Sequence, residues 1–191
     1  MAFQALRPRP SGLIAAGMDL AAALPMATAE KTKRAEQPVE IGIDAAHRRS
    51  VAEGLGHVLA DTYALLVKTH SFHWNVTGPQ FRALHSLFEE QYIELQQAVD
   101  EIAERIRALG HLAPGSFSRF SELTSIEEES GAPAAEDMVR QLATGHETVD
   151  RTCRTVVASA EAAGDQVTLD LVVERMQVHE KQAWMLRSIL Q

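Results

Sequence analysis

The chain has 191 residues and a formal net charge of −8, which is enough length for one domain with a sizeable core. The acidic balance argues against a nucleic-acid binder that uses its whole surface, and it suits a protein that collects cations. Cys153 is the only cysteine, which excludes an intrachain disulfide framework and a cysteine-based zinc or iron–sulfur site. A single cysteine is consistent with a reducing cytoplasm, which is the expected location. No apolar run reaches about 20 residues, so the sequence predicts no transmembrane helix.

Residues 1–44 differ in composition from the rest of the chain and are predicted to form a flexible N-terminal extension. Its moderately apolar segment, residues 13–29, ends in an Ala-Thr-Ala triplet, so a secretory signal has to be weighed. Asp19 inside that segment argues against a signal. The alternative is an upstream start codon, with Met26 as the usual first residue. In either case a polar tail carries the basic residues Lys31, Lys33 and Arg34.

Two long helices are predicted in the first half of the remaining domain, residues 45–191. The first begins at residue 45 or 46 and continues to about Val76. Gly78 suits a left-handed turn after it, and Pro79 suits the first turn of the second helix. The second helix ends at Gly110.

Two more long helices come after a long linker, residues 111–132. Apolar residues at helical spacing within the linker predict a short helix there. Pro133 is expected to open the third helix, which continues to Gly164. The fourth begins at Asp165 or Gln166 and runs to the C-terminus, with these apolar residues: Leu169, Val173, Met176, Trp184, Leu186 and Ile189. No segment alternates with a period of two, so no sheet is expected. The elements predict an all-α fold, a four-helix bundle with a short helix in its central crossover.

The second helix carries the most informative pattern. At ~100° per residue, four residues with metal-binding side chains share a narrow arc: His85, Glu89, Asp100 and Glu104. A simple alternative is a solvated face with i,i+4 charges. The arc lies beside an apolar face whose residues recur at three- and four-residue steps: Phe81, Leu84, Phe88, Leu95, Val99, Ile102 and Ile106.

One chain cannot gather these four residues, because positions 85 and 104 lie roughly 28 Å apart along a helix. Their positions are, however, symmetric about residues 94 and 95. An antiparallel copy crossing there would set His85 opposite Glu104 and Glu89 opposite Asp100, which makes two identical shared sites. His73, just upstream, can point to the same place, although a histidine there could also simply cap its helix.

Imidazoles and carboxylates together suit Fe(II) better than a thiolate site would, although zinc is also compatible. The usual di-iron bundle holds its metals between Glu-x-x-His pairs in its interior. This sequence has no such pair, and its core positions look uniformly apolar. The bundle interior is therefore expected to contain no ligands, which favours a site between subunits.

The remaining polar residues receive simpler interpretations. Cys153 is expected to be an inert buried thiol. Glu90, Glu94 and Glu101 are expected to form a solvated face of the second helix, with a cavity lining as the alternative. The other histidines show no matching carboxylate spacing and are expected to be structural or exposed: His47, His57, His70, His111, His146 and His179.

Two sequence motifs resemble the signatures of the Dps family of mini-ferritins (DNA-binding proteins from starved cells). The first is His-Trp-Asn-Val-Thr-Gly-Pro-Gln-Phe at residues 73–81, and the second is Asp-Glu-Ile-Ala-Glu-Arg at residues 100–105. The likeness continues through the stretch from Glu174 to Leu190 and covers residues 46–191.

This resemblance implies a ferritin-like fold and a hollow homo-dodecamer built from two-fold dimers. It implies a ferroxidase that oxidises Fe(II) with hydrogen peroxide, stores a ferric mineral and protects against oxidative stress. Trp74 is implied as an aromatic neighbour that intercepts radicals, besides its simpler role in packing. The implied ligands, which are also the catalytic residues, are His73, His85 and Glu89 of one subunit with Asp100 and Glu104 of its mate. In the family the position of Glu89 is more often Asp.

DNA binding in this family usually depends on tails rich in lysine and arginine. Here the three basic residues of the polar tail are balanced by acidic ones within residues 26–44, so one tail is nearly neutral. Many tails on one shell could still gain avidity. Two alternatives to the ferroxidase therefore stay open: a DNA-binding architectural protein of the nucleoid with weak or no ferroxidase activity, and a structural shell with a degenerate site.

Overall fold

The computed structural model describes residues 39–191. The signal-like segment, the possible Met26 start and the basic tail of Lys31, Lys33 and Arg34 lie outside those residues. Within residues 39–191 there are five helices and no strand, so the all-α prediction is confirmed. The helices are α1 (Ala45–Asn75), α2 (Phe81–Ala108), α3 (Phe117–Leu123), α4 (Ala135–Ala163) and α5 (Gln166–Ile189).

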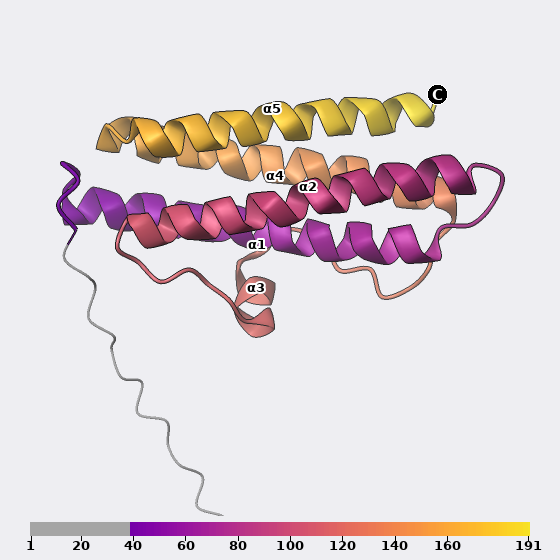
Figure 1. The fold of residues 1–191 in the computed structure, drawn as a ribbon, viewed down its shortest axis with the longest axis horizontal. Helices are drawn as coiled ribbons and strands as arrows, with labels where there is room; N and C mark the ends of the chain where they lie inside the picture. Colours follow the sequence, from indigo (N-terminus) through magenta and orange to yellow (C-terminus); the bar gives the residue numbers. More distant parts are fainter. Residues whose placement is uncertain (1–38) are drawn as a thin grey trace, which may run out of the picture. The chain divides into compact units, whose positions relative to one another are not determined.

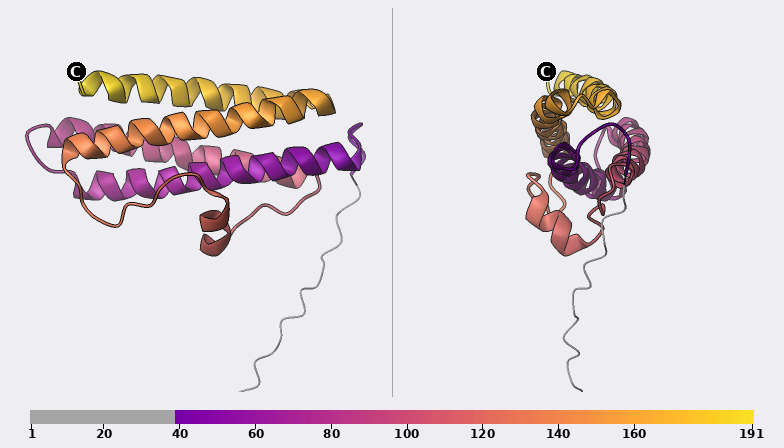
Figure 2. Two further views of the ribbon diagram at one scale, coloured as in Figure 1. Left: turned by 180° about the vertical axis from the view of Figure 1, so that it is seen from behind. Right: turned by 90° about the vertical axis from the view of Figure 1, so that its left-hand side faces the viewer.

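The four long helices lie side by side as two antiparallel hairpins, α1 with α2 and α4 with α5 (Figure 1). The hairpins join mainly through α1 and α4, which pack against each other. A view along the helices shows all four around a common axis, with α3 outside them (Figure 2). This is the predicted bundle, with the short helix in the long crossover between α2 and α4.

The helix ends follow from local hydrogen bonding. The Asp44 carboxylate accepts bonds from the backbone N–H groups of Ala46 (3.0 Å) and His47 (3.1 Å), which starts α1. Gly164 has a φ of 63°, the left-handed conformation that ends a helix at little cost for glycine, and it closes α4. The prediction for Pro133 was slightly wrong. It precedes α4, whose first residue is Ala135, so it lies outside the first turn.

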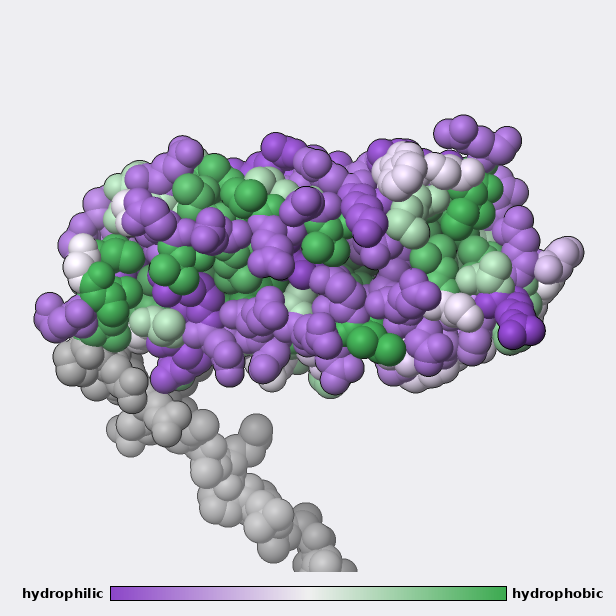
Figure 3. Space-filling model, turned by 45° about the horizontal axis from the view of Figure 1, so that its top comes forward, coloured by the Kyte–Doolittle hydropathy of each residue, from purple (hydrophilic) through white to green (hydrophobic). Residues whose placement is uncertain are grey.

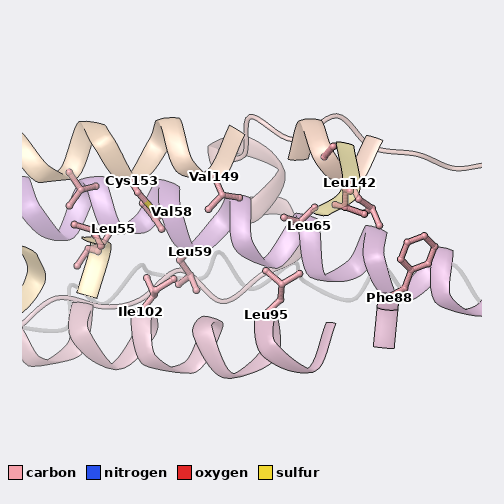
Figure 4. Close-up of a cluster of buried hydrophobic side chains, with 14 of the residues drawn as sticks. Leu55, Val58, Leu59, Leu65, Phe88, Leu95, Ile102, Leu142, Val149 and Cys153 are labelled. Atoms are coloured by element: carbon pink, nitrogen blue, oxygen red, sulfur yellow. The ribbon is translucent and has the colours of Figure 1, made fainter. Parts of the chain in front are cut away.

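The core is built from interlocking apolar side chains, mostly of α1, α2 and α4 (Figure 4), and Val172 and Leu186 of α5 also belong to it. The apolar face predicted for α2 is confirmed over most of its length, since five of its seven residues are buried. Phe81 was wrongly included, because it starts the helix at the bundle's end and is 46% exposed. Val99 is half-buried at the edge of that face.

A buried carboxylate fixes the crossover to the bundle. Asp61 of α1 has no solvent exposure, and its two oxygens accept bonds from the Thr124 hydroxyl (2.9 Å), the Ser125 backbone N–H and the Thr152 hydroxyl (2.6 Å). Upstream of that anchor, the Phe120 ring of α3 stacks on Tyr63 of α1 with 4.5 Å between centroids. Three donors compensate the carboxylate for its lost hydration, so the long segment is tied to α1 and α4.

The expectation of a uniformly apolar interior was wrong. Two buried histidines, a buried arginine and a buried glutamine lie among the four helices: His146, His179, Arg175 and Gln91. The buried face of α5 in particular is mixed, and it consists of Thr168, Val172, Arg175, His179, Ala183 and Leu186. The apolar residues that the sequence suggested for this face include three exposed ones: Val173, Trp184 and Ile189.

Candidate metal centre

The connection between α1 and α2 brings two of the predicted ligands together. His73 lies in the last turn of α1 and His85 in the first turns of α2, twelve residues later. Gly78, with a φ of 104°, lets the chain reverse between them. The two imidazole rings stack with 3.8 Å between centroids and 19° between planes.

Each imidazole is held in orientation by the backbone of the other helix. The Nδ1 of His73 lies 2.9 Å from the carbonyl oxygen of His85, and the Nδ1 of His85 lies 2.8 Å from the carbonyl oxygen of His73. A carbonyl can only accept, so both Nδ1 atoms carry the hydrogen and donate it. In the neutral imidazole rings, both Nε2 atoms therefore keep a lone pair. Metal-binding histidines commonly show this arrangement, in which the second ring nitrogen donates to a carbonyl.

The three carboxylates remain apart from the histidines in the single subunit. Glu89, Asp100 and Glu104 all lie exposed along α2. Within residues 39–191 no three His, Cys, Asp or Glu side chains are grouped to hold a metal ion. One chain thus supplies an oriented histidine pair at one end of α2 and carboxylates further along it. The sharing of ligands between subunits stays a prediction.

Aromatic rings surround the histidine pair, and some were missed from the sequence. Trp74 is 66% exposed, and its ring centroid lies 4.1 Å from that of His70. Within residues 39–191 its ring contact is with His70 and not with His73. Tyr92 contacts both His70 (4.3 Å) and the edge of His73 (5.1 Å). Tyr92 follows His85 by seven residues, two helical turns, and this spacing could have identified it.

A second histidine pair lies inside the bundle, where none was expected. His146 of α4 and His179 of α5 are fully buried, and their Nδ1 atoms lie 2.9 Å apart. Arg175, one turn before His179, places Nη2 3.5 Å from its Nε2. The same guanidinium forms a two-pronged ion pair with Glu94 of α2. Glu94 is therefore an ion-pair partner of α5, and the prediction of a purely solvated residue was wrong.

Charge and burial affect these interior groups strongly. Burial, together with the nearby Arg175 cation, lowers the pKa of His146 to about 3. Burial, His146 and Arg175 also lower the pKa of His179 well below its usual value. Burial raises the pKa of the Cys153 thiol to about 12, so the thiolate does not form near neutral pH. The expectation that Cys153 is buried is confirmed.

Comparison with known proteins agrees with this architecture. A family model described as a ferritin-like domain matches residues 52–191. DNA protection during starvation protein 2 of Bacillus anthracis is 38% identical over 142 residues, which cover 74% of this chain and 97% of that protein. The crystal structure of a Dps protein from Vibrio cholerae O1 superposes with a TM-score of 0.77 at 30% identity, covering 80% of this chain and 97% of that one.

The chain belongs to the Dps family of mini-ferritins. Similarity also extends to a low temperature-induced protein of Nostoc sp., 43% identical over 155 residues that cover 80% of this chain and 87% of the relative. The Vibrio cholerae protein is described as a member of a superfamily of ferritin-like diiron-carboxylate proteins. As for membranes, none of the helices between residues 39 and 191 combines the length and apolar character that a bilayer span needs.

Proposed function

We propose that this Dps-family chain is a ferroxidase whose sites form between two subunits. The observation that carries the proposal is the His73–His85 pair, with both Nδ1 hydrogens bound to carbonyls and both Nε2 lone pairs free. Imidazole nitrogens presented in this way suit a borderline cation such as Fe(II). Carboxylates from a second subunit would complete the set, with Glu104 opposite His85 and Asp100 opposite Glu89 of the first.

The exposed surface of α2 supports this pairing. Ile93 is next to the proposed crossing point at residues 94 and 95, and it is 46% exposed. At ~100° per residue it lies within the arc that contains His85 and Glu104. An apolar side chain there would be covered by the antiparallel helix of a partner subunit.

The proposed reaction uses two Fe(II) ions and hydrogen peroxide as substrates. Each Fe(II) gives one electron, the O–O bond of peroxide breaks, and two protons complete two water molecules. Delivery of both electrons together avoids release of hydroxyl radical. The protein's residues hold and orient the ions, His73 and His85 through Nε2 and the carboxylates through oxygen. The ferric product would be stored as mineral inside a hollow dodecamer.

Further apolar groups are available for such an assembly. On the face shown in Figure 3, which includes α5, apolar side chains form separate groups among polar ones. This helix exposes Val167, Val173, Trp184 and Ile189. Contacts between subunits would remove these side chains from water.

The test is an anaerobic titration of the assembled protein with Fe(II), followed by addition of peroxide while ferric absorbance is recorded. The wild type should oxidise two Fe(II) per peroxide, much faster than free Fe(II). His85→Ala should slow this oxidation by about 100-fold or more, because loss of even a supporting residue around a metal costs 10–100-fold. The matched control is His57→Ala, which removes an exposed histidine of α1. A wild type no faster than free Fe(II) would favour the degenerate shell, and an unimpaired His85→Ala would move the site elsewhere.

A further inference from the structure

The interior histidine pair has no role in the proposed reaction, yet it forms a continuous polar chain across three helices. The chain runs from Glu94 of α2 through Arg175 and His179 of α5 to His146 of α4. Both histidines have no solvent exposure, and Arg175 is 4% exposed. Buried polar side chains normally satisfy their hydrogen bonds, and here the direction of each bond can be worked out.

Arg175 sets that direction because a guanidinium can only donate. Its Nη2 faces the Nε2 of His179 at 3.5 Å, so that nitrogen carries the lone pair. The hydrogen of His179 is then on Nδ1 and is donated to the Nδ1 of His146, 2.9 Å away. The hydrogen of His146 is consequently on Nε2, a buried atom with no hydrogen-bond partner. Both imidazoles are neutral in this arrangement.

Neither imidazole of this hydrogen-bonded row can accept another proton without losing one of its hydrogen bonds. A proton on the Nε2 of His179 would point at the Arg175 cation. A proton on the Nδ1 of His146 would collide with the hydrogen that His179 donates. Either change leaves a charged imidazole inside the bundle, where an unpaired charge is costly.

Each surrounding carboxylate already has a cationic or hydrogen-bonding partner, although the buried Oδ1 of Asp150 has none and its pairing is through Oδ2 alone. Glu94 is bound by Arg175, and on α1 Asp61 is bound by hydroxyl and backbone donors. On α4, Asp150 pairs with Arg154 and Glu147 pairs with Arg187. On α5, Glu180 pairs with Arg154. Cys153 of α4 is a neutral thiol.

We propose that the His146–His179 pair makes the folded subunit acid-labile, because the bundle closes only around two neutral imidazoles. As pH falls, the unfolded chain takes up protons at both positions and the closed bundle does not. A hollow of about 350 Å³, lined by His179 with Glu147, Asp150, Glu180, Ala183 and Arg187, gives water a short route to the pair once the helices loosen. The proposal is independent of the ferroxidase assignment.

The direction of the effect follows from proton linkage. A histidine whose pKa is lower in the folded state than its ordinary 6.5 contributes stability that is complete above that pH. Below pH 6.5 the contribution decreases, and for His146 the decrease continues to about pH 3. Two such groups raise the unfolding equilibrium constant by up to about 100-fold for each pH unit in this window.

The first measurement uses the wild-type assembly and keeps every residue in place. Deuterium exchange at the imidazole C2 position, followed by mass spectrometry across pH 8 to 4, reports the titration of each histidine. His146 and His179 should show no titration near pH 6.5 while the far-ultraviolet circular dichroism remains native. Titration of both near pH 6.5 in the folded protein would overturn the proposal.

The second measurement compares urea unfolding at pH 7, 6 and 5 for the wild type and His146→Leu/His179→Leu. Replacement of both partners by apolar groups of similar size avoids an unpaired polar atom. In the wild type, unfolding should take up as many as two protons at these histidines, which changes the unfolding equilibrium constant by up to about 100-fold per pH unit. The double variant should lack this part of the pH dependence. His57→Gln, at an exposed position of α1, should retain that dependence. Equal pH dependence in the double variant and the wild type would overturn the proposal, and the exchange measurement decides the case if the double variant does not fold.

Discussion

Two pairs of histidines in this subunit have opposite hydrogen-bonding arrangements. In the pair at the α1–α2 connection, each Nδ1 donates to a backbone carbonyl, at 2.9 and 2.8 Å, and both Nε2 atoms are free. In the interior pair the two Nδ1 atoms bond to each other at 2.9 Å, and one Nε2 faces an arginine. The first pair keeps two lone pairs for a metal ion, whereas both lone pairs of the second pair already accept hydrogen bonds within the bundle.

The comparison shows that a candidate metal ligand differs from a structural histidine in the hydrogen-bond partners of its ring nitrogens, and not in its burial. His73 is only 8% exposed and is nearly as buried as His146. They differ in their partners. A backbone carbonyl fixes the tautomer of His73, whereas the tautomer of His146 is set through His179 by the Arg175 cation. The same residue type therefore receives a metal-binding role in one place and a packing role in the other.

The largest expected effect comes from a test of whether the His73–His85 pair forms only half of a metal site, with the other half supplied by a second subunit. Subunits with His85→Ala and subunits with Asp100→Ala should each be inactive alone. After random co-assembly, half of the dimers are mixed and each holds one intact site, so about a quarter of the wild-type oxidation rate should return.

Oxidation rates of purified mixed shells, with subunit ratios checked by mass spectrometry, provide this measurement. Mixing His85→Ala with His73→Ala is the matched control, because both lesions lie in the same half of the site and no activity should return. Inactive shells of verified His85→Ala and Asp100→Ala composition would exclude ligands shared between subunits.

A smaller effect is expected when the cation of the second pair is removed. Arg175→Leu leaves Glu94 without its partner and removes the donor that faces His179. The free energy of unfolding should fall by about 2–3 kcal/mol, less than the loss of a fully buried pair because the Glu94 side chain is 30% exposed. Urea denaturation at pH 7.5 measures it.

Arg140→Leu serves as the control for this stability measurement. Arg140 pairs with Glu136 and Asp137 on the surface of α4, where such pairs contribute less than about 1 kcal/mol. Iron oxidation by assembled Arg175→Leu protein should match the wild type. Loss of oxidation in a folded Arg175→Leu shell would show that the two histidine pairs are coupled.

The smallest effect is expected from deletion of residues 1–38, which retains the Asp44 cap of α1. Both histidine pairs lie in the remaining chain, so neither the oxidation rate nor the unfolding midpoint should change. If the shell retards DNA in a gel, retardation should weaken with the deletion and with added salt, because Lys31, Lys33 and Arg34 are lost. Full retardation by the shortened protein would place the DNA contacts on the bundle.

The fold could be predicted from the sequence where the helix faces are chemically uniform. On α2, five of the seven apolar residues that the spacing selects are buried: Leu84, Phe88, Leu95, Ile102 and Ile106. On α5 the prediction failed, because Arg175 and His179 occupy buried positions while Val173 and Trp184 point outward. A hydrophobic pattern cannot identify a buried face whose polar groups are satisfied by partners on other helices.

The candidate site was predictable in part for a related reason. His73 and His85 lie at positions that a motif and a helical period identify, and the structure places their rings together. Their carbonyl bonds depend on the geometry of the connection between α1 and α2, which no spacing rule contains. A signal for the interior pair was present, since His146 continues the buried series of Leu142, Val149 and Cys153 at steps of three and four residues.

The two tryptophans of the chain have a practical consequence. Trp74 and Trp184 are 66% and 61% exposed in the isolated subunit, one at the end of α1 and the other near the end of α5. An indole in water emits at longer wavelength than one enclosed by protein. If neighbouring subunits cover these two faces, the colour of the intrinsic fluorescence will shift toward the blue as the shell forms. The chain would then report its own assembly in real time, without a dye or an added label.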